Sequence, residues 1–254
     1  MSNSSALDSV IRAQNGVKWA RVVLKLSGEA FGGGQYGIAG HVVKQLAEDI
    51  IMARRMGVDV AVVIGGGNIW RGKFGEGQGL TDRAQADYMG MLATVINALA
   101  LQDMLEQLNQ EARVMTALHI DNVAEPYIRR RALRHLEKGR VVILAGGLGA
   151  PFFTTDTPAA LRAAELSANA VIKGTHSGVK GVYTADPKLD SSAVLLEETT
   201  YMDVLNNSWD VMDPTSITFC MDNSIPIVVF DAMEAGNLAK VLQGVRGAGT
   251  LVQS

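Results

Sequence analysis

The sequence predicts an α/β fold with a mainly parallel sheet, and three observations support it. Stretches rich in Val, Ile and Leu recur with little polar alternation, as in strands covered on both faces. Segments with helical periodicity lie between these stretches. Several predicted strands run directly into glycine. The strands are predicted near 20–26, 58–64, 113–117, 140–145, 168–173 and 225–230, and the helices near 38–56, 81–108, 124–138, 157–167, 213–223 and 236–243.

The composition indicates one domain of moderate size. The chain has 254 residues, of which 48% are hydrophobic, enough for a single large core. The first nineteen residues are polar, so we expect a flexible extension over 1–19, no signal peptide, and one domain over 20–254. No stretch approaches the roughly 18 apolar residues of a membrane span. We therefore expect a soluble, cytoplasmic protein with no membrane partner.

The net charge and the cysteine content argue against a nucleic-acid-binding protein and against a disulfide-stabilised protein. The net charge is −3 without long charged blocks, so nucleic acid is not an expected partner. The single cysteine, Cys220, excludes an internal disulfide and agrees with a reducing compartment. On a helix it is predicted to be a small apolar group rather than a nucleophile.

The first predicted strand ends in Lys25-Leu26-Ser27-Gly28-Glu29. Lys25 interrupts a run of buried residues, and an unpaired buried ammonium is costly. It either reaches solvent at the end of the strand or faces an anionic ligand there. The serine and glycine that follow favour the ligand.

Two further strands also end in glycine. One runs into Gly65-Gly66-Gly67-Asn68 and the other into Gly146-Gly147-Leu148-Gly149. Such turns let backbone N–H groups approach a ligand, although a tight turn also needs glycine. Because parallel strands end at one edge of a sheet, the three turns predict a phosphate site there. Arg71 follows within reach, and its guanidinium suits phosphate oxygens.

The long predicted helix over 81–108 has an apolar stripe at steps of three and four residues. A subunit interface and burial within one chain explain the stripe equally well. A glycine-dense segment, 72–79, precedes this helix and is predicted to be a mobile loop. The stripe consists of Met89, Leu92, Ile96 and Leu99.

The segment after the third glycine turn reads Pro151-Phe152-Phe153-Thr154-Thr155-Asp156-Thr157. Asp156 or Thr157 is predicted to cap a helix that begins at Pro158. The threonine hydroxyls and backbone N–H groups also suit an anion. The two aromatic rings either flank a base or fill the core.

A final segment, Tyr183-Thr184-Ala185-Asp186-Pro187, follows the strand that ends at Lys173. The tyrosine can contact a purine and the aspartate can accept from ribose hydroxyls, although Asp-Pro also occurs in plain turns. The polar loop that begins at Asp186 is either a lid or a connection.

Several common motifs are absent from the sequence. There is no G-x-x-x-x-G-K-[ST] and no G-x-S-x-G, and the four histidines lack metal-ligand spacing. A G-x-G-x-x-G match over 32–37 lies too far beyond its strand for a dinucleotide fold.

Taken in order, these segments resemble the amino acid kinase superfamily and, within it, the bacterial uridylate (UMP) kinase family. The resemblance covers about residues 20–252. The runs D-x-M-G-M-L-A-T and P-F-F-T-T-D are the most specific to the uridylate branch. The matching segments are 25–30, 63–68 with 71–72, 87–94, 146–156, 183–187 and 221–230.

The resemblance implies a three-layer αβα sandwich, an amino acid kinase domain over 20–254, and the reaction ATP + UMP → ADP + UDP. It implies Mg²⁺ held mainly through nucleotide phosphates, without a protein-only metal site. By motif, the catalytic residues are Lys25, Arg71 and Asp156. The ATP-binding residues are Lys25, Leu26, Ser27, Gly28, Gly67, Arg71, Thr175, Tyr183 and Asp186. The UMP-binding residues are Gly66, Asp87, Leu148, Gly149, Ala150, Pro151, Phe152, Phe153, Thr154 and Thr155.

The family also implies a homohexamer with GTP activation and UTP inhibition. This chain departs from the family pattern at three places. The segment 173–181 is longer than usual and has Lys180 where aspartate is usual, and 148–150 lacks the usual T-G-N. Gln102 and Glu106 replace the arginine and histidine of the proteobacterial GTP site, so strong GTP activation is not expected.

Three alternative functions agree less well with the sequence. Another amino acid kinase would phosphorylate carbamate or an acidic amino acid, which residues 87–90 and 152–153 disfavour. A nucleotide-sensing regulator would not need Lys25, Arg71 and Asp156. An oxidoreductase based on 32–37 is the weakest alternative.

Overall fold

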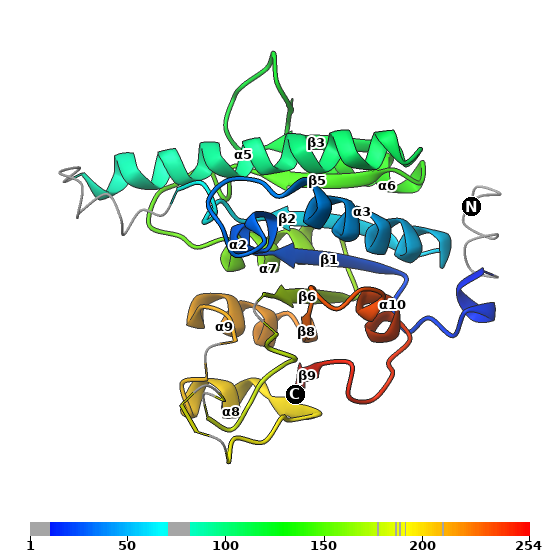
Figure 1. Cartoon of the computed structure of the whole chain (residues 1–254), viewed down its shortest axis with the longest axis vertical. Helices are drawn as coiled ribbons and strands as arrows, with labels where there is room; N and C mark the ends of the chain where they lie inside the picture. Colours follow the sequence, from blue (N-terminus) through cyan, green and yellow to red (C-terminus); the bar gives the residue numbers. More distant parts are fainter. Residues whose placement is uncertain are drawn as a thin grey trace.

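The computed structural model describes residues 11–70, 82–176, 178–185, 187, 189–190, 192–209 and 211–254. In these residues the strands form one nine-stranded sheet in the order β4-β3-β5-β2-β1-β6-β8-β9-β7. Helices cover both faces of the sheet (Figure 1). Among the strand pairs of this sheet, β8 and β9 run antiparallel and the others run parallel. The predicted three-layer α/β sandwich with a mainly parallel sheet is confirmed.

The strands are β1 Arg21–Leu26, β2 Asp59–Ile64, β3 Ala112–Thr116, β4 Glu125–Pro126, β5 Val141–Ala145, β6 Ala170–Thr175, β7 Glu198–Thr200, β8 Ile227–Asp231 and β9 Thr250–Gln253. The helices are α2 Gly28–Gly32, α3 Gly40–Arg55, α5 Arg83–Gln107, α6 Arg129–Glu137, α7 Asp156–Glu165, α8 Tyr201–Asn206, α9 Pro214–Asp222 and α10 Asn237–Leu242.

The six predicted strands and six predicted helices are present, and the differences occur in short elements. The strands β4, β7 and β9 and the helices α2 and α8 were not predicted, because none of them has a long apolar run. The predicted helix over 124–138 begins only at Arg129, since Glu125–Pro126 pair with β3 as a strand. Proline also disfavours helical geometry in the residue before it.

Alternate residues of the buried strands face two separate cores. From β1, Leu24 packs with α3, α5 and α10 on one face of the sheet. Its neighbour Val23 packs with α6, α7, α8 and α9 on the other face. Cys220 is buried in α9 within this second core, as predicted. Since side chains alternate along a strand, Lys25 must lie on the same face as Val23.

The described part of the N-terminal segment lies against the domain. The Arg12 guanidinium donates to the Gly57 carbonyl at 2.8 Å, and the Lys18 N–H donates to the Leu242 carbonyl at 2.9 Å. Trp19 is buried. Residues 1–10 and the predicted mobile loop over 72–79 lie outside the described residues.

The helix α5 runs alongside β3 and β5 at one end of the sheet (Figure 1). It meets the length and composition of a membrane span, but 44% of that stretch is buried inside the protein. Core helices of soluble proteins meet the same criteria, so α5 gives little reason to expect a membrane span.

Candidate active site

The predicted glycine turns meet at one edge of the sheet. The parallel strands β5, β2, β1 and β6 lie side by side in that order, so their carboxyl ends coincide. The turn after β1 packs tightly on the turn after β2: a Cβ atom on Gly28 would lie 2.2 Å from the Gly67 nitrogen. Only glycine permits this approach, which brings two sets of backbone N–H groups to one place.

Two lysines and one aspartate form the charged centre of this edge. Lys25 in β1 and Lys173 in β6 are register partners and lie on the same face of the sheet. The Lys25 Nζ lies 2.8 Å from Asp156 Oδ1, and the Lys173 Nζ lies 3.2 Å from Asp156 Oδ2. Lys173 also donates to the Val211 carbonyl. Each oxygen of the carboxylate thus contacts one ammonium group.

The ion pairs determine the charge state of Asp156, which is only 8% exposed. Burial raises the pKa of its carboxyl, but the charges and hydrogen bonds of Lys25 and Lys173 lower it by more, and the net direction is down. The carboxylate is therefore ionised at neutral pH. Two ammonium charges against one carboxylate leave a net positive centre.

The structure corrects the predicted start of the helix after this segment. The helix α7 begins at Asp156 instead of Pro158, and neither Asp156 nor Thr157 caps it. The Asp156 side chain faces the two lysines, while the Thr157 and Thr154 hydroxyls donate to Asp213, Thr154 at 2.6 Å. Asp213 caps α9 by accepting from the Ser216 N–H at 2.9 Å. The loop after β5 is thereby tied to α9.

A cavity lies at the glycine turns, with Gly66 and Gly147 in its lining. It is lined by seven of the ten residues predicted to bind UMP: Gly66, Asp87, Leu148, Ala150, Phe153, Thr154 and Thr155. The lining is completed by Trp70, Ala86, Gly90, Met91, Thr94 and Gly147. Gly149, Pro151 and Phe152 are not part of the lining. The cavity is bounded by α5 on one side and by the loop after β5 on the other.

Most of the residues predicted for UMP therefore meet at one cavity. Asp87 also holds the loop in place, because its Oδ2 accepts from the Phe152 N–H at 2.8 Å. Phe152 has a left-handed backbone with φ of 72° and is 67% exposed, and Phe153 is also exposed. The alternative that these two rings fill the core is wrong.

The structure describes Ser27, Thr175 and Tyr183, three of the residues predicted to bind ATP. Ser27 caps α2 by accepting from the Ala30 N–H at 3.3 Å, and its hydroxyl lies 3.1 Å from His176 Nδ1. Thr175, at the end of β6, donates to the Phe230 carbonyl at 3.0 Å. Tyr183 forms an isolated bridge with Leu195. Arg71 and Asp186 lie outside the described residues, so their places in the site stay predictions.

Sequence reasoning missed Lys173 and Asp213 as residues of the site. The signal for Lys173 was present, because it interrupts the buried run of β6 as Lys25 interrupts β1. No comparable signal marked Asp213, which is distant in the sequence and meets the loop only in the folded chain.

Comparisons with known proteins agree with this geometry. The sequence model of the amino acid kinase family matches residues 20–231. The crystal structure of a UMP kinase from Bacillus anthracis superposes with a TM-score of 0.88 at 39% identity, covering 92% of this chain and 96% of that chain. A UMP kinase from Ureaplasma parvum gives a TM-score of 0.86 at 35% identity, covering 92% and 98%.

The close approach of the two glycine turns can be tested with Gly28→Ala. We expect this variant to lose most ATP binding, because its Cβ would displace the Gly67 backbone and with it the N–H groups. Gly40→Ala is the control, since no atom lies within 4 Å of a Cβ there. Calorimetric titration with a non-hydrolysable ATP analogue measures both; equal affinities would contradict the prediction.

The acid dependence of stability tests the Asp156 ion pairs. A carboxyl with a lowered pKa stabilises the fold above its unfolded-state pKa of about 4, and this contribution is lost as the pH falls through the native value. Asp156→Asn should cost about 3–5 kcal/mol at pH 7 by leaving the ammonium groups without their partner.

The stability difference between Asp156→Asn and the unsubstituted protein should therefore shrink below about pH 4. Urea unfolding at a series of pH values measures it. A difference that stays constant between pH 7 and the acid range would show that the ion pairs do not stabilise the fold. Asp103→Asn, on the exposed face of α5, is the control.

Proposed function

The chain belongs to the amino acid kinase family, and from this premise we propose that it transfers the γ-phosphate of ATP to UMP, giving ADP and UDP. One observation carries the proposal: a net positive Lys25–Asp156–Lys173 centre lies at the sheet edge beside the cavity lined by Gly66, Asp87 and the loop after β5. The two UMP kinases of similar structure support UMP as the acceptor.

Phosphoryl transfer from ATP to UMP requires little covalent catalysis by the protein. The attacking group is a phosphate oxygen of UMP, which is already anionic near neutral pH, so no general base is needed. Two polyanions must instead be held in line against their mutual repulsion. Lys25 and Lys173 supply positive charge at the ends of adjacent strands, and the glycine turns supply N–H donors that suit the phosphates.

In this mechanism Asp156 acts on the lysines rather than on the substrate. Its two oxygens lie 2.8 and 3.2 Å from the ammonium groups, which keeps them in place before the nucleotides bind. Arg71, from the segment after the second glycine turn, is assigned a further contact with the phosphates. Thr175, Tyr183 and Asp186 are assigned to the adenosine end.

We assign Mg²⁺ to the nucleotide phosphates. Within the described residues there is no group of three or more His, Cys, Asp or Glu side chains that could hold a metal ion. Asp156 lies in the site but already contacts two ammonium groups. A magnesium ion bound through the phosphates would neutralise charge that develops during transfer.

An ADP-release assay with Mg-ATP tests the function. The acceptors to compare are UMP, CMP, dUMP, carbamate, aspartate and acetylglutamate. ADP release that depends on UMP supports the proposal. ADP release with carbamate or an acidic amino acid would show that the chain is another kind of amino acid kinase. Binding of UMP without ADP release would favour the nucleotide-sensing alternative.

The role of the Lys25–Asp156–Lys173 centre in turnover can be tested by substitution. Lys25→Ala and Asp156→Ala should each remain folded and lose about 10²-fold or more in kcat, because charge stabilisation of the transferred phosphate is lost. Lys44→Ala, an exposed residue paired with Glu48 at 3.9 Å on α3, should keep full activity. Circular dichroism verifies folding; a folded Lys25→Ala protein with full activity would remove Lys25 from the mechanism.

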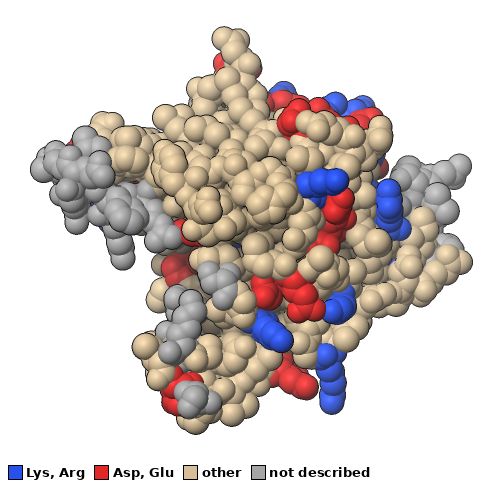
Figure 2. Space-filling model, in the orientation of Figure 1, with Lys and Arg blue, Asp and Glu red and all other residues tan. Residues whose placement is uncertain are grey.

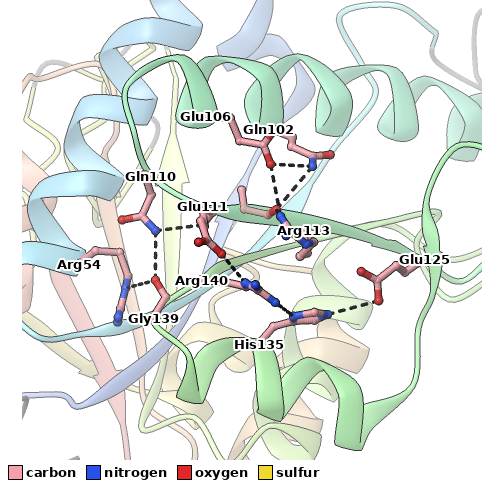
Figure 3. Close-up of polar contacts among 11 residues, drawn as sticks. Arg54, Gln102, Glu106, Gln110, Glu111, Arg113, Glu125, His135, Gly139 and Arg140 are labelled. Atoms are coloured by element: carbon pink, nitrogen blue, oxygen red, sulfur yellow. Dashed lines mark hydrogen bonds and ion pairs between the residues drawn. The ribbon is translucent and has the colours of Figure 1, made fainter. Parts of the chain in front are cut away.

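For regulation we propose that GTP activates this enzyme only weakly. In the region of Gln102 and Glu106, two arginines are already paired with carboxylates (Figure 3). Arg113 Nη1 lies 3.4 Å from Glu106 Oε1, and Arg140 Nε donates to Glu111 Oε2 at 2.6 Å. An anionic effector would have to displace these carboxylates.

A GTP titration at subsaturating UMP, with free Mg²⁺ held constant, measures this regulation. We expect less than a twofold rise in rate, a bound of about 0.4 kcal/mol in coupling free energy. Activation of several-fold would contradict the proposal. UTP, the second expected effector, is titrated in the same assay as an inhibitor.

We also propose that copies of the chain associate through α5, as a homohexamer in a cytoplasmic setting. The stripe of Met89, Leu92, Ile96 and Leu99 is between 36% and 49% exposed, so burial within one chain does not account for it. Figure 2 shows few charged side chains along the middle of α5. Apolar surface of this kind is typical of subunit interfaces.

The interface can be tested with Ile96→Lys, which places a charge in the middle of the stripe. We expect the variant to sediment as a smaller species, since a buried unpaired ammonium opposes association. Val194→Lys, an exposed apolar position elsewhere, is the control. Analytical ultracentrifugation measures the size of the assembly. If Ile96→Lys and the unsubstituted protein form assemblies of the same size, the interface lies elsewhere.

A further inference from the structure

A buried pair of asparagine side chains joins the turn after β2 to the helix α5. Asn68 directly follows the Gly65–Gly67 turn, and Asn97 lies in α5. Asn97 Nδ2 donates to Asn68 Oδ1 at 2.7 Å, and Asn68 Nδ2 donates to Asn97 Oδ1 at 3.0 Å. Asn97 is 0% exposed and Asn68 is 5% exposed. Buried amides are costly unless every donor and acceptor is paired.

The remaining amide hydrogens of the pair bind two backbone carbonyls, one in the turn after β2 and one in the segment after α2. Asn97 Nδ2 donates to the Gly65 carbonyl at 2.8 Å, and Asn68 Nδ2 donates to the Gly37 carbonyl at 2.8 Å. Each side-chain amide has two N–H donors, so all four are used and both amide oxygens accept. A fully satisfied buried network of this kind holds one geometry.

The turn after β1 contacts the same pair. A Cβ on Gly28 would lie 2.7 Å from Asn68 Oδ1 as well as 2.2 Å from the Gly67 nitrogen. The Ser27-Gly28 turn, assigned to ATP phosphates, therefore packs directly on the Asn68 side chain. Asn68 therefore contacts both glycine turns.

On the UMP side, the same face of α5 holds the loop after β5. Thr94 Oγ1 accepts from the Gly146 N–H at 2.7 Å, and Asp87 Oδ2 accepts from the Phe152 N–H at 2.8 Å. Asp87, Thr94 and Asn97 are separated by seven and three residues, which places them on one face of the helix. One rigid helix thus binds the loop for the acceptor and the turns for the donor.

We propose that Asn97 is a positioning residue for phosphoryl transfer, which sets the distance between the two bound nucleotides through α5. The inference rests on the proposed transfer from ATP to UMP. Asn97 touches neither nucleotide in this arrangement and acts through Gly65 and Asn68. In-line transfer is sensitive to such a distance, since a displacement of about 1 Å can cost about 10²-fold in rate.

The test compares Asn97→Ala with Leu101→Ala, which removes an equally buried side chain one turn further along α5. Asn97→Ala should lower kcat by about 10²-fold, while each nucleotide bound singly keeps its affinity. Leu101→Ala should lower Tm and leave the kcat of the folded protein unchanged. A folded Asn97→Ala protein with kcat near that of the unsubstituted enzyme would overturn the proposal.

A double variant separates positioning from simple loss of packing. If the two amides act as one unit, Asn68→Ala with Asn97→Ala should lose no more kcat than the more impaired single variant. Full additivity of the two losses would show that Asn97 does not act through Asn68, contrary to the proposal.

Hydrogen exchange on the unsubstituted protein provides a test that needs no variant. UMP added alone should slow amide exchange in residues 27–37, which lie on the ATP side and are joined to α5 through Asn68. Unchanged exchange there would contradict coupling through the amide pair. Failure of the proposed function appears separately, as an unsubstituted enzyme that binds UMP and forms no UDP.

Discussion

The bridging of Lys25 and Lys173 by Asp156 is the interaction on which the rest of the site depends. Two ammonium groups on neighbouring buried strands repel each other, and neither would be stable there without a counter-charge. Asp156 supplies it from the first residue of α7. The same carboxylate leaves one positive charge uncompensated, which is what a site for two polyanions requires.

The parallel sheet supplies the second constraint, because it delivers the ends of β1, β2, β5 and β6 to one edge. Glycine at these ends allows the backbones to approach more closely than any side chain would permit. The cavity assigned to UMP and the charged centre therefore lie at the same edge of the sheet. In the proposed function this topology brings donor and acceptor together. Through Asp87, Thr94 and Asn97, α5 binds both the loop after β5 and the turn after β2.

Much of this arrangement could be predicted from the sequence, because the signals are local. Apolar runs ending in glycine predicted the strands and the edge at which they meet, and Lys25 was recognisable as a charge inside a buried strand. Seven of the ten residues predicted for UMP line one cavity. The elements that were missed, such as β4 and β9, are too short to show a period and are stabilised by pairing with strands distant in the sequence.

By itself the sequence determined the fold class, the glycine turns and the family, since each depends on residue types at short spacing. Only the tertiary structure decided that Lys173 joins Lys25 on one carboxylate, that Asp213 holds the loop before α7, and that the stripe on α5 faces outward. These facts depend on which strands are neighbours and on which face each side chain lies. The separation of two residues in the sequence reveals neither the neighbouring strands nor the face of a side chain, because contacts between remote segments form only when the whole sheet assembles.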